Sequence, residues 1–333
     1  MHLTRKLVWL LSLPLIGSCG GPPQKATPRP SDYDLERIVG NQLEEPIRVA
    51  AWAAPEPQQT NLFIYSVLLP QLDEDLMRRV ATHFGVKGEI EQIRGDTLGH
   101  IGYWIRNTDP ANPKANREIK YWLSIGSFTY GTGDNGYRYN KETKRHEEYH
   151  VPDKESCKAN AAELLPLLGL STNDFECHPD GRLQWYSGES TISYNDKSSG
   201  QRRKVVIQRS VHLNQRVPGG GVTCGVGDGG KLRIDFVTEG KISGIEWFFR
   251  KMKKAGEAKP KSSKDIMRDL RKRNAWTWHQ SAPTSMTVTN CVLAYPQGNS
   301  WLDQDYVWPF FMVTGTNNDG RATTLYVPLD WGN

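Results

Sequence analysis

Short runs of β-branched and aromatic residues recur along the chain from Ile47 onward, separated by turns rich in glycine, proline and asparagine. Runs of this length and composition predict β-strands. Asn318-Asp-Gly320, between the last two runs, predicts a tight hairpin turn. The predicted strands are residues 47–52, 61–69, 102–106, 119–130, 181–186, 190–194, 204–213, 232–237, 242–249, 286–295, 306–313 and 322–329.

Other segments have the spacing of amphipathic helices. Leu76, Val80 and Phe84 form one apolar stripe, acidic residues occupy the first turn, and Gly85 ends the segment. Strands follow each predicted helix. This order favours an α+β fold of antiparallel sheets with helices packed on one face, in repeated helix-then-strands units. The predicted helices are residues 73–84, 152–168 and 262–273.

The N-terminus has the anatomy of an export signal. Arg5 and Lys6 precede an apolar run over residues 7–16, which is too short to span a bilayer as a helix. Residues 16–19, Ile-Gly-Ser-Cys, resemble a bacterial lipobox. The resemblance implies cleavage after residue 18 and acylation of the Cys19 thiol. The alternative is an ordinary cleaved signal followed by an unrelated cysteine.

These features divide the chain into four parts. Residues 1–18 are the signal peptide, and residues 19–45, rich in proline and polar residues, form a flexible tether. We expect an N-terminal α+β domain over residues 46–150 and a C-terminal α+β domain over residues 151–333. An aspartate after the acylated cysteine is associated with inner-membrane retention. This chain has Gly20 at that position, which favours the outer membrane in a host with two membranes. Otherwise the protein lies on the outer face of the plasma membrane.

Composition fits an exported globular protein. Charged residues make up 24% of the chain and hydrophobic residues 37%. The net charge of +5 falls to +3 after signal removal, because the two positive residues Arg5 and Lys6 are lost. The remaining cysteines are Cys157, Cys177, Cys224 and Cys291.

An even number of cysteines outside the cytosol predicts two disulfides, with three pairings open. We favour Cys157 with Cys177, the nearer pair in sequence, and Cys224 with Cys291. Four buried free thiols are the alternative, because sequence alone does not bring two Cα atoms together.

Two passages in the C-terminal half resemble PepSY and YycH/YycI-type extracytoplasmic domains. Residues 216–247 are similar to their strand–glycine–strand hairpin, and residues 288–315 to their closing strands. The resemblance covers roughly residues 150–330. It implies a protein that binds or restrains other proteins, such as sensor kinases and proteases, and it transfers no active site. A lipid anchor in place of a transmembrane helix, and four cysteines, depart from the pattern.

Residues 146–150, His-Glu-Glu-Tyr-His, match the H-E-x-x-H pattern of zinc hydrolases. That motif needs a helix, which places both imidazoles on one metal with the glutamate beside the bound water. Charged flanks and the nearby Pro152 favour a solvated loop instead. A zinc hydrolase using His146, Glu147 and His150 is therefore the third function considered. We predict no metal site, no cofactor and no enzymatic activity.

Basic residues concentrate between residues 250 and 273. Eleven Lys and Arg stand against three Asp and Glu, a local charge of +8, so the rest of the mature chain carries −5. Such a segment attracts anionic lipid, anionic glycopolymer or an acidic partner; export argues against nucleic acid. The alternative is a solvated linker and helix face. The candidate binding residues are Lys253, Lys254, Arg271 and Lys272.

Eleven tryptophans are the other unusual feature. Exposed tryptophans suit a glycan or peptide groove, although apolar strands bury most of their rings. Trp276 and Trp278 lie beside the basic segment and outside a clear strand, so we expect these two to be exposed.

The sequence thus predicts a lipid-anchored cell-envelope binding or regulatory protein without catalytic activity. Its membrane contact is the N-terminal lipid, and its expected partner is a membrane or secreted protein. A surface lipoprotein that binds glycans through its tryptophans and basic segment is the alternative.

Overall fold

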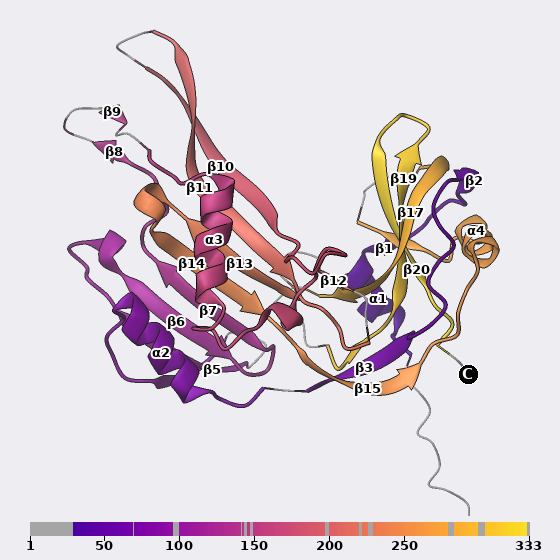
Figure 1. Ribbon diagram of the computed structural model, residues 1–333, viewed down its shortest axis with the longest axis horizontal. Coiled ribbons are helices and arrows are strands. Elements are labelled where there is room, and N and C mark those ends of the chain that lie inside the picture. The colour runs from indigo at the N-terminus through magenta and orange to yellow at the C-terminus, as the bar shows by residue number, and fades with distance from the viewer. Residues whose placement is uncertain are drawn as a thin grey trace, which may run out of the picture.

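The structure is a computed structural model of the 333-residue chain. It describes residues 29–68, 70–95, 100–140, 142, 145–146, 149–196, 200–219, 222–225, 229–278, 283–298 and 304–331. Cys19, the signal peptide and Glu147 lie outside these residues. The described chain is mixed α+β and mostly strand. This confirms the predicted α+β class. Figure 1 shows two lobes joined along one side, with a gap between their other ends.

The larger lobe is built on an antiparallel sheet of eight described strands. Four consecutive strands form one meander and four later strands form a second, and the two meanders meet in the middle, where β14 pairs with β7. The strand order is β10 (Tyr186–Asn195), β11 (Arg202–Asn214), β13 (Lys231–Phe236), β14 (Ile242–Phe248), β7 (Ser127–Thr132), β6 (Arg117–Trp122), β5 (Ile101–Asn107) and β4 (Glu91–Arg94).

Two helices, α2 (Glu74–Phe84) and α3 (Lys154–Leu164), lie on the near side of this sheet in Figure 1. An aspartate caps each helix, Asp73 for α2 and Asp153 for α3, and each carboxylate accepts a hydrogen bond from a first-turn N–H, 2.8 Å long in both helices. Both helices share one hydrophobic core with alternate residues of the sheet. One cross-strand row of that core is Ile105, Ile119, Tyr130, Ile245, Ile234 and Val211.

The smaller lobe contains a sheet of seven described strands, in which β12 and β2 are parallel to β17 and the other pairs are antiparallel. A three-stranded sheet of β15, β3 and β18 lies beside it. Helices α1 (Asp32–Val39) and α4 (Ser263–Arg271) belong to this lobe. Its strands are β1 (Asn41–Gln42), β16 (Trp276–Thr277), β20 (Ala322–Pro328), β19 (Phe310–Asn317), β17 (Ser285–Gln297), β12 (Val222–Gly225), β2 (Arg48–Trp52), β15 (Lys251–Glu257), β3 (Phe63–Leu68) and β18 (Tyr306–Val307).

Short elements complete the described chain. A two-stranded hairpin of β8 and β9 projects near the tip of the long β10–β11 hairpin (Figure 1). The remaining elements are β8 (Tyr139–Asn140), β9 (Arg145–His146) and the 3₁₀ helices Pro113–Ala115, Thr172–Asp174 and Thr238–Gly240.

The lobes do not follow the expected division of the chain at residues 150 and 151. The core of the larger lobe comes from residues 72–249, whereas the cores of the smaller lobe come from residues 35–67 and 252–331, with Val217 added. Strands from both sides of residue 150 therefore share one sheet. We call residues 70–250, apart from Val217 and β12, the inserted lobe, and residues 29–68 with 251–331 the host lobe, because the first interrupts the second in sequence.

The predicted flexible tether, residues 19–45, also contains folded structure. Ser31 and Asp34 form a capping box at the start of α1. Leu35, Ile38 and Val39 are buried against the host lobe, so the folded body begins within the predicted tether. None of the helices in the described ranges is long and apolar enough to cross a membrane.

Candidate binding surface

The predicted disulfides are not formed. Cys157, Cys177 and Cys291 are free thiols, and the side chain of Cys224 lies outside the described residues. Cys157 is buried on the inner face of α3 and its Sγ contacts the backbone oxygen of Pro152, while the Sγ of Cys177 contacts other backbone carbonyls. The two thiols of the favoured pair therefore have different neighbours. Cys291 lies in the core of the host lobe, on β17.

We expect an alkylating agent such as iodoacetamide to modify Cys177 well before Cys157 or Cys291. Burial raises the pKa of Cys157, and it raises the pKa of Cys291 from 9.0 to about 12. At pH 8 such a shift lowers the thiolate fraction by about 10³-fold. Modification of Cys291 should therefore increase as the pH rises toward 12.

Peptide mass mapping of the folded protein over time measures this order, and the same reaction in urea is the control. Equal rates for the three thiols in the folded protein would contradict the prediction, as would disulfide-linked peptides that contain them.

The four candidate basic residues do not lie on one element. Lys253 and Lys254 are exposed on β15, whereas Arg271 and Lys272 are exposed at the end of α4. Arg250, which contributes to the charge count, is buried and donates hydrogen bonds to the side chains of two glutamines. The basic segment is therefore divided between a strand and a helix, with part of its charge inside the protein.

The two candidate tryptophans differ in exposure. Trp276 is 6% exposed and packs in the host lobe, so its predicted exposure is wrong. The reason is its pairing with Gln42 of β1, a segment that the sequence assigned to the flexible tether. Trp278 is 46% exposed, as predicted.

The described residues of the H-E-x-x-H motif, His146, Tyr149 and His150, are not in a helix, which a zinc hydrolase needs. His146 belongs to strand β9, and the backbone N–H of His150 donates a 2.8 Å hydrogen bond to Thr238 Oγ1. Glu147 lies outside the described residues. Within the described ranges, no group of three or more His, Cys, Asp or Glu side chains is arranged to hold a metal ion.

His146 instead lies at the centre of four tyrosine rings. Its imidazole stacks on the ring of Tyr194, which comes from the β10–β11 hairpin, with 4.0 Å between centroids. The rings of Tyr137 and Tyr139 approach it edge-on at 5.5 Å and 5.1 Å. The Tyr149 hydroxyl completes the group, 3.1 Å from His146 Nδ1. We call these five residues the aromatic cluster; it joins the two projecting hairpins.

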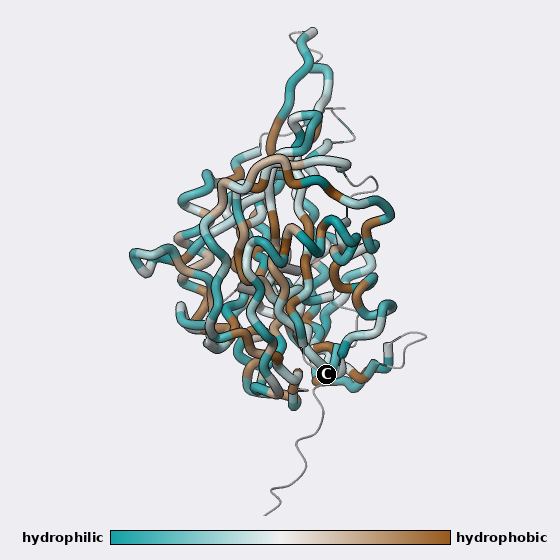
Figure 2. The backbone as a smooth tube through the Cα atoms, turned by 90° about the vertical axis from the view of Figure 1, so that its right-hand side faces the viewer, coloured by the Kyte–Doolittle hydropathy of each residue, from teal (hydrophilic) through white to brown (hydrophobic). Residues whose placement is uncertain are grey.

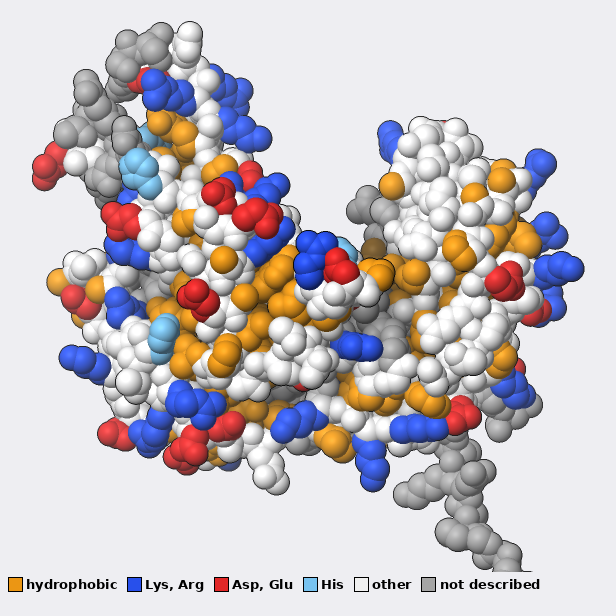
Figure 3. Space-filling model, in the orientation of Figure 1, with side chains coloured by type: hydrophobic (Ala, Val, Ile, Leu, Met, Phe, Trp, Pro, Cys, Tyr) orange, Lys and Arg blue, Asp and Glu red, His pale blue; other side chains and the backbone are white. Residues whose placement is uncertain are grey.

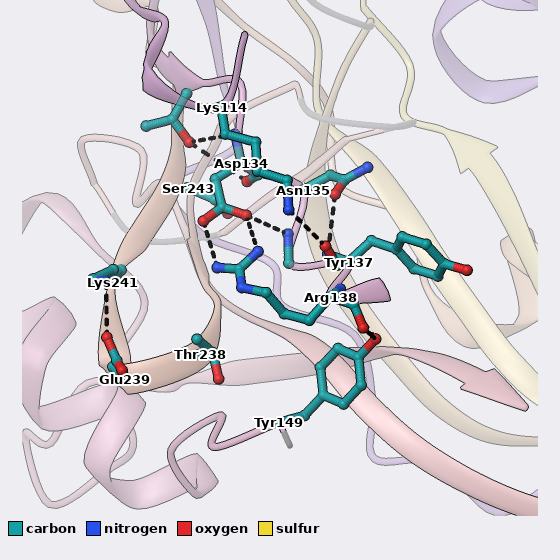
Figure 4. A network of polar contacts seen from close by, with 12 residues as sticks. Lys114, Asp134, Asn135, Tyr137, Arg138, Tyr149, Thr238, Glu239, Lys241 and Ser243 are labelled. Carbon is teal, nitrogen blue, oxygen red and sulfur yellow. Dashed lines mark hydrogen bonds and ion pairs between the residues drawn. The ribbon is translucent and has the colours of Figure 1, made fainter. Parts of the chain in front are cut away.

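A polar network holds the loop that carries the cluster (Figure 4). Arg138 makes two hydrogen bonds of 2.6 Å to the Asp134 carboxylate, which also accepts from the N–H of Gly136. Burial alone would raise the pKa of Asp134, but the hydrogen bonds from Arg138 and Gly136 outweigh it and the pKa is lowered. The carboxylate thus remains charged and paired under neutral conditions.

Backbone contacts extend this network to the tyrosines. Tyr149 Oη donates a 2.9 Å hydrogen bond to the backbone oxygen of Arg138. It also accepts a 3.1 Å hydrogen bond from the backbone N–H of Arg138. Lys114 Nζ donates to the backbone oxygen of Tyr137 at 3.1 Å. The backbone that carries the aromatic cluster is therefore held by contacts of three side chains, those of Arg138, Tyr149 and Lys114 (Figure 4).

Two rings of the cluster face solvent although their backbone is held. The exposed fractions of Tyr137 and Tyr139 are 41% and 40%. Figure 2 shows the β10–β11 hairpin projecting beyond the body, and Figure 3 shows Lys and Arg side chains along it. Arg202, Arg203 and Lys204 are exposed on β11.

No motif in the sequence singles out these tyrosines. The signal that indicates them is the spacing Tyr137-x-Tyr139 after Gly136, because alternate residues of an extended segment point to the same side. Compared with known proteins, the chain matches no family model, no curated protein and no solved structure. The resemblance to PepSY and YycH/YycI-type domains stays a prediction.

Proposed function

We propose that this chain is a lipid-anchored cell-envelope binding protein without catalytic activity, which engages a membrane or secreted protein through the aromatic cluster. The observation that carries the proposal is the exposure of Tyr137 and Tyr139 on a backbone that Arg138, Tyr149 and Lys114 hold in place. The proposal includes acylation of Cys19.

Exposed, ordered tyrosines are suited to protein recognition. A tyrosine offers a large apolar ring and a hydroxyl while losing only two side-chain torsions on binding. Edge-on contacts with His146 already restrict these rings, so less conformational entropy is lost when a partner covers them. This supports a binding role for the cluster.

The position of the cluster also suits an anchored protein. The first described helix, α1, belongs to the host lobe, whereas the cluster lies at the projecting end of the inserted lobe (Figure 1). A lipid on Cys19 would tether the host lobe and leave the projecting hairpins to reach a partner. Exposed Arg202, Arg203 and Lys204 beside the cluster favour a partner surface that carries carboxylates.

The decisive experiment starts with the protein from Gly20 onward, immobilised and exposed to a detergent extract of its own envelope. We expect one enriched protein that free bait displaces. Replacing Tyr137 and Tyr139 together by alanine should weaken its binding at least tenfold, because hot-spot aromatics contribute about 2 kcal/mol or more.

Tyr33→Ala is the matched control, since Tyr33 is 63% exposed but lies on α1 in the host lobe. It should bind as the unchanged protein does. The proposal fails if the double variant, with unchanged thermal unfolding, retains the captured protein with the same dissociation constant.

We further propose that the inserted lobe contains two copies of one helix-then-strands unit, with the helix on one face, and that α4 begins a third. In support, α2 precedes the β4–β7 meander and α3 precedes the meander that ends at β14. The last strands of the two meanders pair with each other. An experimental structure in which the two units do not superpose strand for strand would contradict this proposal.

A further inference from the structure

We propose a second binding site, in a cavity where the two lobes join, that takes a free α-amino acid with an apolar side chain. This site is separate from the aromatic cluster and goes beyond the proposed function. The cavity has a volume of about 340 Å³ and is lined by residues of both lobes. Its volume lies within the range of small-molecule sites, which occur preferentially at domain interfaces.

Contacts between separate segments of the chain build the walls of this cavity. Gly126, in the turn between β6 and β7, has φ 65°, and a Cβ atom added there would lie 2.9 Å from the backbone oxygen of Phe249. The turn therefore packs directly on the segment that carries Arg250. In the host lobe, the N–H of Val67 donates a 2.8 Å hydrogen bond to the backbone oxygen of Asp305. All of these segments except Phe249 itself contribute lining residues.

The cavity has a buried cation in its lining. Arg250 is 5% exposed, and its Nη1 donates hydrogen bonds of 3.2 Å to Gln297 Oε1 and 3.4 Å to Gln304 Oε1. Gln304 lines the cavity together with Arg250. Both acceptors are neutral amides, so these two bonds orient the guanidinium without neutralising its charge. A planar guanidinium matches the geometry of a carboxylate, which is therefore the first group that the ligand presents.

Asp305 supplies a negative charge at the same cavity. Its side chain is exposed and belongs to the lining. Within the described residues, its carboxylate makes no hydrogen bond or ion pair. An ammonium group on the ligand is attracted to this carboxylate, whereas a simple anion such as sulfate is repelled by it. The second group of the ligand is therefore an ammonium.

The remaining large side chains of the lining are apolar. They are those of Val67, Leu68, Pro70 and Ile125. Leu68 is 44% exposed, although it is a large hydrophobic residue. A ligand side chain that packs on Leu68 and Ile125 removes their apolar surface from water, which favours binding. The third group of the ligand is therefore an apolar side chain.

A carboxylate, an ammonium and an apolar side chain occur together in a free apolar α-amino acid. An internal residue of a peptide has neither of the two charges, and a terminal residue has only one of them. The cavity volume is also near the lower limit for small-molecule sites, which suits one compact molecule. The lining thus matches a free amino acid better than a peptide segment.

The test titrates L-alanine, L-valine, L-leucine and L-methionine separately against the protein from Gly20 onward by calorimetry. We expect at least one of them to bind. Its N-acetyl derivative lacks the ammonium and its amide lacks the carboxylate, so each should bind at least tenfold more weakly. Asp305→Asn should weaken binding of the amino acid at least tenfold, and it should leave the weaker binding of the N-acetyl derivative unchanged, because that derivative has no ammonium.

Asp319→Asn is the matched control, because Asp319 is also an exposed aspartate of the host lobe but lies in the turn between β19 and β20. It should bind the amino acid as the unchanged protein does. Asp305→Asn should fold normally, since its side chain is exposed and its backbone oxygen can still accept from Val67.

The proposal is overturned if none of the four amino acids binds, if either derivative binds as tightly as its parent, or if Asp305→Asn leaves the affinity unchanged. It is also overturned if sulfate binds at this site more tightly than the amino acids do. Capture of the envelope protein should be unaffected by Asp305→Asn, so this test and the test of the proposed function can fail separately.

Discussion

A fragment of residues 70–250 is expected to fold on its own, whereas a fragment of residues 46–150 is expected to remain unfolded. The first fragment contains the complete eight-stranded sheet, both of its helices and every residue of its core. The second ends before β14, so β7 becomes an edge strand, and it also lacks the core residues of α3. Its remaining apolar surface has too few partners to offset the conformational entropy of folding.

Heteronuclear NMR spectra and thermal unfolding of the two fragments measure this difference. The fragment 70–250 should give dispersed amide signals and one cooperative transition, and the fragment 46–150 neither. Cooperative unfolding of residues 46–150 would show that the chain divides at residue 150 and would contradict the inserted-lobe topology.

We expect Asp269→Ala to lower the free energy of unfolding of the host lobe strongly. Asp269 Oδ2 lies 2.6 Å from Lys261 Nζ, and the two side chains are only 11% and 13% exposed. Lys261 also donates to the backbone oxygen of Pro328. Removing the carboxylate leaves a buried ammonium without its counter-charge, which costs about 3–5 kcal/mol of the free energy of unfolding.

Urea unfolding followed by hydrogen exchange at β17 and β20 measures this loss in the host lobe. Arg268→Ala is the control on the same helix, because Arg268 is 59% exposed and pairs with Asp265 at the surface. Its loss should be below about 1 kcal/mol. A double change to apolar residues, Lys261→Met with Asp269→Leu, should recover much of the stability. Equal losses for Asp269→Ala and Arg268→Ala would contradict the expected role of burial.

Local features of the fold were readable from the sequence because their determinants are neighbours in the chain. The start and end of α2 depend on Asp73 and Gly85, and Gly85 adopts the left-handed conformation, with φ 63°, that ends helices. Asp153 caps α3, although that helix ends at Leu164, before the predicted end at residue 168. Fold class follows from such local signals.

Long-range features were not readable in the same way. The proline-rich flanks of α1 predict a flexible tether, whereas the partners that bury Leu35 and Ile38, such as Phe310, lie far along the chain. The burial of Trp276 depends on the same distant segment. Periodicity reports that a face is apolar but not which segment covers it.

At the candidate binding surface, neither composition nor the sequence motif predicts the arrangement that the fold produces. Composition directed attention to tryptophans and to clustered basic residues, whereas the exposed aromatic pair consists of tyrosines in a loop. The sequence motif at residues 146–150 identified a chemically active type of residue, His146, but its environment comes from Tyr194 on another hairpin. Only the assembled fold shows that environment.

The insertion of one lobe in the other sets an order of events for a chain that emerges from its N-terminus. When residue 250 has emerged, the inserted lobe is complete, but β2 still lacks β17, whose Ser285 pairs with Arg48 across 237 positions of sequence. Closing so long a loop in an unfolded chain is entropically unfavourable. Folding of the inserted lobe brings Leu68 beside Lys251, neighbours in the β3–β15 ladder. The two sequence segments of the host lobe are then adjacent, and only a short loop has to close. Assembly of the host lobe should therefore follow that of the inserted lobe and depend on it.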